Sequence, residues 1–131
     1  MKKIYVEVIQ PNRTIIKGEF DHVIVPGTEG DFGVYSGHTP FITMIRPGIL
    51  EVFTNDDKEG FAIHDGFVSV ENNKVTIVCE KIEKADGIDV RRAEEAKLRA
   101  EKRMKHSDEE TDFRRAEFSL KRALVRLSLG Q

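Results

Sequence analysis

Residues 75–105, VTIVCEKIEKADGIDVRRAEEAKLRAEKRMK, contain the change of pattern that decides the fold prediction. As far as Lys84 the chain is rich in β-branched side chains. From Ile88 to Lys105, Ala, Glu, Lys, Arg and Leu dominate, and neither Gly nor Pro occurs. The first composition favours strands and the second favours helices. We therefore expect an α+β protein with a β domain over residues 1–84 and a helical segment over residues 85–131.

The β domain is predicted from alternating apolar residues and from regularly spaced turns. Ile4, Val6 and Val8 recur with the period of two that marks a half-buried strand. Further β-branched runs, among them residues 60–63 and 67–70, are separated by turn signals at Pro11-Asn12, Pro26-Gly27, Pro47-Gly48, Asn55-Asp56-Asp57, Asp65-Gly66 and Asn72-Asn73. Short strands that recur roughly every 8–12 residues, with no helix between them, predict a β-sandwich or barrel.

The segment after Lys84 is predicted to form two helices. In each half of it, small or apolar residues at three- and four-residue steps share one face: Ala93, Ala96, Ala100 and Met104, then Phe113, Ala116, Leu120, Ala123 and Leu127. Ser107, with Glu110 three residues later, has the pattern of a capping box that begins the second helix. The short connection predicts an antiparallel hairpin. Because its seam is rich in alanine and buries little apolar area, we expect the hairpin to be able to open.

The composition is that of a small domain with an appendage. The 131 residues are 39% hydrophobic and 34% charged, and the net charge of -2 gives no general attraction to nucleic acid or to an acidic membrane. No stretch approaches the roughly 18–20 apolar residues of a bilayer span, so direct membrane insertion is not expected. Cys79 is the only cysteine, which indicates a reducing compartment.

Catalytic chemistry is not indicated by any motif. Gly27, Gly30 and Gly33 are not followed by the Gly-Lys-Ser/Thr of a phosphate loop, and we interpret them as turn glycines. The four histidines and Cys79 have no metal-ligand spacing, and His64-Asp65 is interpreted as a turn rather than a catalytic pair. Nucleic-acid binding is also not expected, because acidic residues interrupt the basic ones of the tail and few aromatics accompany them.

The second predicted helix has a surplus of positive charge. Against Asp112 and Glu117 stand five basic residues: Arg114, Arg115, Lys121, Arg122 and Arg126. Such a face is explained equally well as a solvated surface and as a surface that binds an acidic partner.

A polar cluster surrounds the expected start of the first helix. In one interpretation Asp89 caps the helix and Arg92 points to water. In another, the helix N-terminus favours an anion, and Arg122 and Arg126 return to the level of Arg92 in the folded hairpin and complete a phosphate clamp. Glu83 lies close by in the sequence, and both interpretations stay open on the pattern alone.

Three motifs resemble those of one family. Residues 30–41, GDFGVYSGHTPF, look like a G-x-x-G-[IV]-x-x-G-H-[AT]-P loop, and residues 64–70, HDGFVSV, look like a G-G-[FV]-x-x-V strand. Residues 88–93, IDVRRA, match an I-D-x-x-R-A motif. In this order, and over essentially the whole chain, they resemble the epsilon subunits of F-type ATP synthases, called delta in mitochondria.

The resemblance implies a sandwich of about ten strands followed by a helical hairpin. It implies a non-catalytic rotor subunit whose sandwich couples the gamma subunit to the c-ring during proton-driven ATP synthesis. The hairpin would fold on the sandwich, or extend along gamma into the alpha/beta catalytic head and inhibit ATP hydrolysis, with Arg115, Arg122 and Arg126 as the inhibitory contacts. The implied location is the cytoplasmic face of the cell membrane, as a peripheral part of the complex.

The resemblance also implies ATP as a regulatory ligand, with or without Mg2+. Bound ATP would favour the folded, non-inhibitory hairpin. Carried over residue by residue, the ATP-binding positions are Glu83, Asp89, Arg92, Arg122 and Arg126, and no metal ligand is implied among the protein side chains. Two alternatives are a free-standing ATP-sensing module without a rotary partner and a structural adaptor that uses its helices as a clamp.

Overall fold

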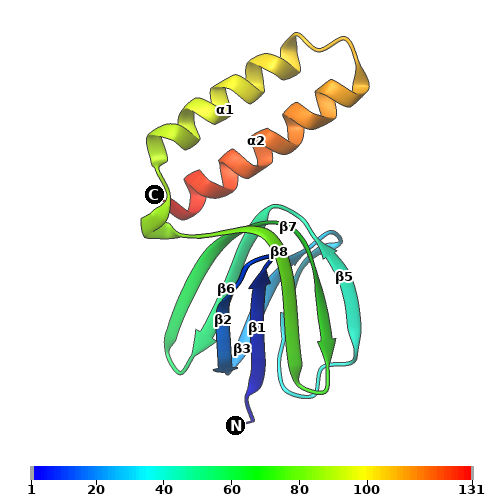
Figure 1. The fold of residues 1–131 in the computed structure, drawn as a ribbon, viewed down its shortest axis with the longest axis vertical. Helices are drawn as coiled ribbons and strands as arrows, with labels where there is room; N and C mark the ends of the chain where they lie inside the picture. The colour runs from blue at the N-terminus through cyan, green and yellow to red at the C-terminus, as the bar shows by residue number, and fades with distance from the viewer. Residues whose placement is uncertain (1, 131) are drawn as a thin grey trace.

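The computed structural model describes residues 2–130, which form a β-sandwich domain and a helical hairpin (Figure 1). The eight strands are β1 (Ile4–Gln10), β2 (Arg13–Phe20), β3 (His22–Gly27), β4 (Gly30–Val34), β5 (Phe41–Ile45), β6 (Gly48–Thr54), β7 (Asp57–Glu71) and β8 (Lys74–Lys84). A short 3-10 helix, η1 (Ala85–Gly87), leads into α1 (Val90–Lys105) and α2 (Glu110–Gly130). The α+β fold class expected from the sequence is confirmed.

Two long strands join the two layers of the sandwich. β7 pairs with β6 over residues 57–63 and with β5 over residues 66–70, so it belongs to both layers. β8 pairs with β7 along most of its length and with β1 in parallel. The continuous strand order is β2-β1-β8-β7-β5-β3-β4, with β6 between β3 and β7. These two strands therefore carry the chain from the sandwich core to its upper end in Figure 1, where the hairpin begins.

The turn expected at Asp65-Gly66 is instead a bend inside β7. Asp65 has a φ of 49°, which turns the strand, while the ladder to β8 resumes at Gly66 and Cys79. Residues 60–63 and 67–70, expected as separate strands, are thus two parts of one strand. This merger accounts for one of the strands by which the observed eight fall short of the expected ten or so. His64 lies in the interior of this strand, so its interpretation as a turn residue is wrong.

The hydrophobic core lies entirely within the β domain. β1 shows the expected alternation, since Ile4, Val6 and Val8 are fully buried. The same inward-facing positions on the other strands complete the cluster: Val23, Val25, Val34, Ile45, Leu50, Val52, Phe61, Ile63, Val68, Val70, Val75, Ile77, Cys79 and Ile82. Because no residue of α1 or α2 belongs to this cluster, the sandwich has a core of its own.

The hairpin is held by the alanine seam that its spacing predicts. Ala93 and Ala100 of α1 and Ala116 and Ala123 of α2 are its buried residues. Alanine allows close approach of the two helices but removes little apolar surface from water, so the seam contributes little stability. Neither helix, over residues 2–130, has an apolar stretch long enough to cross a bilayer.

The two helix starts differ in how well their caps were predicted. Asp89 caps α1 as expected, because its Oδ1 accepts a hydrogen bond of 3.1 Å from the Arg92 amide. The capping box at Ser107 is wrong, since the Ser107 hydroxyl donates to the Glu109 carbonyl and α2 begins only at Glu110. A serine followed by two acidic residues can satisfy its hydroxyl locally, without capping a helix.

The C-terminal half of α2 rests on the upper end of the sandwich (Figure 1). Leu129 packs over Gly60 of β7, where a Cβ would lie 3.2 Å from the Leu129 Cδ1. Arg126 reaches Glu83 at the end of β8. These contacts dock the hairpin by one end, and the turn between the helices lies far from the sandwich.

We predict that Gly66→Ala destabilises the sandwich by at least about 2 kcal/mol, because a Cβ there would lie 2.0 Å from the Val78 carbonyl oxygen and would separate β7 from β8. Urea unfolding of the full chain measures this change. Gly87→Ala is the matched control, since a Cβ at Gly87 meets no atom within 4 Å and should alter the free energy of unfolding by less than about 0.5 kcal/mol. Equal stability of the two variants would contradict this account of the bend.

Candidate functional site

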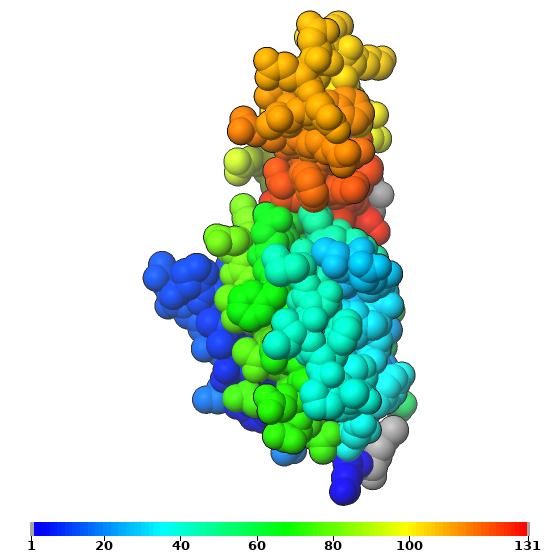
Figure 2. All heavy atoms as spheres, turned by 90° about the vertical axis from the view of Figure 1, so that its right-hand side faces the viewer, coloured from blue at the N-terminus to red at the C-terminus, as the bar shows by residue number. Residues whose placement is uncertain are grey.

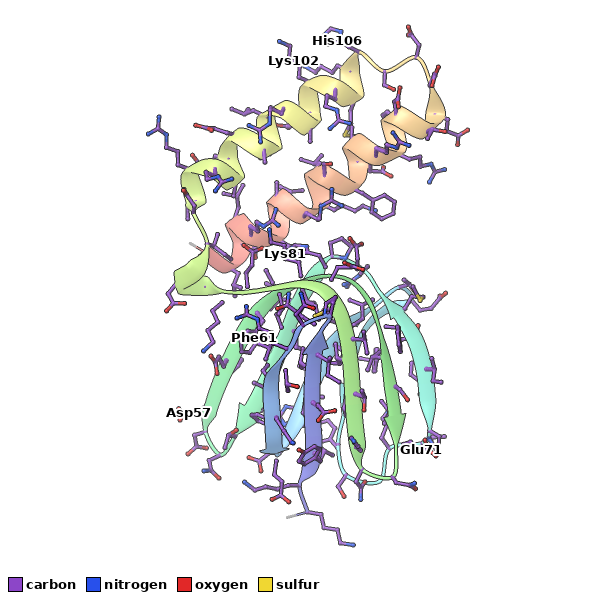
Figure 3. The ribbon with its side chains drawn as sticks, in the orientation of Figure 1. Asp57, Phe61, Glu71, Lys81, Lys102 and His106 are labelled. Atoms are coloured by element: carbon purple, nitrogen blue, oxygen red, sulfur yellow. The ribbon has the colours of Figure 1, made fainter. Side chains whose placement is uncertain are left out.

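A cavity of about 250 Å3 lies where β8, η1 and the two helices meet. Lys81, labelled in Figure 3 beneath the end of α2, marks the sandwich side of this junction. The cavity is lined by Lys81, Glu83, Gly87, Asp89, Arg92, Ala93, Ala96, Arg99 and Arg126. It exists only while the hairpin is folded on the sandwich, because its walls come from both parts.

A second cavity of about 190 Å3 continues the first along the hairpin. It is lined by Ala96, Arg99, Ala100, Arg103, Ser119, Arg122 and Arg126. Ala96, Arg99 and Arg126 line both cavities, so the two form one hollow between the helices. The small alanine side chains of the seam leave room for it.

The hollow is rich in positive charge that internal partners do not neutralise. Among residues 2–130, no ion pair is made by four of its arginines, Arg92, Arg99, Arg103 and Arg122. None of the described residues that line the second cavity is acidic. Guanidinium groups that converge in this way bind phosphate or carboxylate oxygens through paired hydrogen bonds.

The first cavity also offers groups of the opposite polarity. Asp89 uses one carboxylate oxygen to cap α1, which leaves the other oxygen and the exposed start of the helix facing the cavity region. An acidic acceptor beside a helix N-terminus can accept hydrogen bonds from hydroxyl or amino groups of a ligand, while the amides favour its anionic part. The hollow therefore suits a ligand with an uncharged polar end and a polyanionic end.

An ion pair links the floor of the first cavity to α2. The Arg126 Nε donates to the Glu83 Oε1 at 2.7 Å, and the two side chains are 21% and 20% exposed. Burial alone would raise the pKa of Glu83, but the hydrogen bond and the charge of Arg126 outweigh it and hold the pKa below its ordinary value. Glu83 is therefore ionised at neutral pH, and the ion pair is intact there.

His64 lies next to the carboxylate of this ion pair. It is 1% exposed, and its Nε2 is 3.5 Å from the Glu83 Oε1. Burial, followed by the charge of Arg126, lowers the pKa of His64 to about 4, so the ring is neutral at neutral pH.

The structure gathers most of the residues proposed from the sequence. Glu83, Asp89, Arg92 and Arg126 line the first cavity, and Arg122 lines the second. Arg115 is exposed and lines neither cavity, so the three expected inhibitory arginines do not form one surface in the folded hairpin.

Sequence reasoning missed Lys81, Gly87, Arg99 and Arg103 as lining residues. The signal for two of them was present. Arg99 and Arg103 follow Arg92 by seven and eleven residues, a spacing that puts all three on one face of α1. Among the described residues, no group of three His, Cys, Asp or Glu side chains is arranged to hold a metal ion.

A separate apolar surface lies on the sandwich, away from the hollow. Three large side chains with substantial exposure share the outer face of β5 and β7 and define this apolar patch: Ile42, Met44 and Phe67. Ile42 is 73% exposed and Met44 59% exposed, and Met44 is opposite Phe67 in the pairing of β5 with β7. The region that carries the patch, coloured cyan to green, faces the viewer in Figure 2. Clustered apolar side chains of this size mark an interaction surface more often than a solvated one.

Two family descriptions match consecutive parts of the chain, which together span residues 3–130. A family described as "ATP synthase, Delta/Epsilon chain, beta-sandwich domain" matches residues 3–85. A second, described as "ATP synthase, Delta/Epsilon chain, long alpha-helix domain", matches residues 86–130.

Curated relatives carry the name ATP synthase epsilon chain. The chain is 37% identical to that of Nitratidesulfovibrio vulgaris strain DP4, over 96% of this chain and 94% of the relative. It is 38% identical to that of Herpetosiphon aurantiacus, over 98% and 94% of the two chains. It is 36% identical to that of Staphylococcus aureus strain JH9, over 100% and 98%.

Solved structures share the fold. A chain in the OSCP/F1/c-ring structure of the Euglena gracilis mitochondrial ATP synthase aligns with a TM-score of 0.86 at 23% identity, covering 96% of this chain and 79% of that one. A chain in the central stalk/c-ring structure of the Tetrahymena thermophila mitochondrial ATP synthase aligns with a TM-score of 0.74 at 14% identity, covering 99% and 98%.

Proposed function

This chain belongs to the ATP synthase delta/epsilon family, and we propose that it couples the gamma subunit to the c-ring and restrains ATP hydrolysis through an ATP-responsive hairpin. It is a stalk subunit and not a catalytic one. Its place would be the cytoplasmic face of the cell membrane, held there by partners. The observation that carries the regulatory part of the proposal is the arginine-lined hollow, which closes only when the hairpin is folded.

Docking to gamma is supported by the apolar patch. The patch is formed on the outer side of β5 and β7, in the sandwich and not in the hairpin, so it stays available when the hairpin moves. Large apolar and aromatic side chains at the centre of an interface supply much of its binding free energy. A free-standing ATP sensor without a rotary partner would have no use for such a surface.

ATP is the ligand that best fits the hollow. Arg92, Arg99 and Arg122 are free of ion pairs within residues 2–130 and can take phosphate oxygens. Asp89 and the start of α1 lie at the end next to the sandwich, where they suit the base or ribose. Mg2+ would arrive with the phosphates, because the donors of the hollow are mostly cationic.

The same arginines give the switch its two states. Arg122 and Arg126 face the hollow in the folded hairpin, so they cannot at the same time contact a distant acidic surface. If the hairpin extends, both are freed, together with Arg115, for an acidic surface of the alpha/beta head. ATP at a roughly hundredfold excess over its Kd would stabilise the folded state by about 2.7 kcal/mol. A free-energy difference of this size can decide whether the hairpin is folded or extended, because the alanine seam is weak.

We predict that Met44→Glu abolishes copurification with gamma, because it places a charge in the middle of the apolar patch. Pull-down of the full-length variant with purified gamma measures the association. Leu98→Glu is the control, since Leu98 is a comparably exposed apolar residue on α1 and should leave the complex intact. Undiminished binding by Met44→Glu would place the interface elsewhere, and no binding by the wild type would favour the free-standing sensor.

For the nucleotide, we predict that Arg92→Ala weakens ATP binding by about 1.5–3 kcal/mol, the value of a hydrogen bond to a charged group. Calorimetry on the isolated full chain measures the Kd. Arg91→Ala is the matched control, because Arg91 has a side chain that is 88% exposed, pairs with Glu95 alone among residues 2–130 and is not among the residues that line the two cavities. The ATP proposal fails if the wild type takes up no ATP at millimolar concentration, or if the two variants bind alike.

For the brake, we predict that deleting the chain from Ile88 onward raises ATP hydrolysis by the assembled enzyme and leaves coupling intact. The sandwich should stay folded, because its core cluster ends at Ile82. Substituting Arg115, Arg122 and Arg126 together by alanine should release part of the same inhibition. Steady-state hydrolysis by the reconstituted complex is the measurement, and an unchanged rate after the deletion would show that the hairpin is not a brake.

A further inference from the structure

His64 is the one polar side chain in the buried interior of the described residues. Neither of its ring nitrogens has a hydrogen-bond partner within residues 2–130. Leaving a buried polar group unpaired costs about 1–3 kcal/mol, and an apolar residue of similar size would avoid that cost. The position of the ring, at the junction of the two parts, indicates what the histidine contributes.

The charged groups around His64 lie on two elements, β8 and α2, and only α2 moves away when the hairpin opens. On β8, Glu83 lies 3.5 Å from its Nε2, and Lys81 is opposite it in the strand pairing. On α2, Arg126 and Arg122 are close enough for their charges to disfavour an imidazolium. If the hairpin leaves the sandwich, both arginines leave with it, whereas Glu83 and Lys81 stay beside the ring.

Release of the hairpin therefore changes the affinity of His64 for a proton. In the folded state, burial and Arg126 lower its pKa to about 4. In the released state the ring gains access to water at the uncovered end of the sandwich and faces the unpaired carboxylate of Glu83. Its pKa should then rise at least to the ordinary histidine value of about 6.5.

We propose that His64 and Glu83 form a proton-gated latch for the hairpin. With His64 neutral, Glu83 holds Arg126 and the hairpin stays docked. When His64 takes up a proton, Glu83 becomes the partner of the imidazolium, and the docked state loses its ion pair. The inference rests on the proposed function, because it needs a hairpin that opens, and it adds the proton as a second effector beside ATP.

The direction and size of the effect follow from linkage. His64 has the lower pKa in the docked state. Its contribution to the stability of the docked state is therefore complete above about pH 6.5 and decreases as the pH falls towards about 4. Between about pH 8 and about pH 5.5, the ratio of released to docked hairpin should rise about tenfold. Acidification would therefore release the hairpin and strengthen inhibition.

The test uses spin labels on the full-length chain at Asp57→Cys and Lys102→Cys in a Cys79→Ala background. The two positions lie on the sandwich and near the tip of the hairpin (Figure 3). Distance distributions measured by pulsed electron resonance at about pH 8 and about pH 5.5 give the released population. We expect the roughly tenfold rise in the chain with His64, no rise in His64→Gln, and an undiminished rise in His106→Gln, an exposed histidine at the hairpin turn.

A second measurement does not depend on the stability of the His64→Gln variant. Nuclear magnetic resonance titration of the full chain should show that the His64 imidazole remains neutral at about pH 6.5, the ordinary pKa of histidine. In Arg126→Gln, that same imidazole should titrate at a higher pH. A His64 ring that titrates near pH 6.5 in the docked protein, or an Arg126→Gln variant that leaves it unmoved, would overturn the latch.

Failure of the latch can be told apart from failure of the proposed function. A hairpin that ATP holds docked, but whose release does not depend on pH, would overturn the latch and leave the ATP switch standing. A hairpin that stays docked at every pH and without ATP would overturn both.

Discussion

The ion pair between Arg126 and Glu83 is the polar contact on which the arrangement of the two parts depends. Neither helix adds a residue to the hydrophobic core, and the seam between the helices is made of alanines. Apolar packing therefore does not fix the hairpin strongly to the sandwich. A partly exposed ion pair is worth on the order of 1 kcal/mol, although the hydrogen bond of 2.7 Å favours the upper part of the range. Only small free-energy contributions therefore hold the hairpin on the sandwich, and the binding of a ligand can outweigh them.

The position of that ion pair is set by the two long strands. β7 and β8 run through both layers of the sandwich, and the bend at Asp65 lets one strand serve both. Because the two strands are long, they place Glu83 and His64 at the end of the sandwich on which α2 rests. The core strands therefore supply one wall of the hollow, and the rigid part of the molecule positions the acidic half of the contact.

Sequence patterns predicted the elements better than their connections. The alternation of β1 and the alanine spacing of the helices are periodic, and each was confirmed because burial on one face has to repeat with the period of the element. Asp65-Gly66 and Ser107 are single local signals, and both predictions were wrong. The pairing of β7 with β8 continues past Asp65, and the Ser107 hydroxyl donates to the Glu109 carbonyl. Arg99 and the buried His64 were missed, because a charge run resembles a solvated face and no local pattern reveals that a histidine is buried at the junction of the two parts.

The chemistry of arginine allows the latch and a bound nucleotide to act together. Arg126 uses its Nε toward Glu83, which leaves its terminal nitrogens for the two cavities that it lines. A guanidinium offers five donors in a fixed plane, so one side can face a carboxylate while the other faces a phosphate; a lysine ammonium has no such second edge. Arg126 could then bind a phosphate while it keeps its hydrogen bond to Glu83. In the proposed latch, protonation of His64 would act on Glu83, whereas ATP would act on Arg126. The two proposed effectors would therefore meet at one ion pair, ATP strengthening the docked state and the proton weakening it.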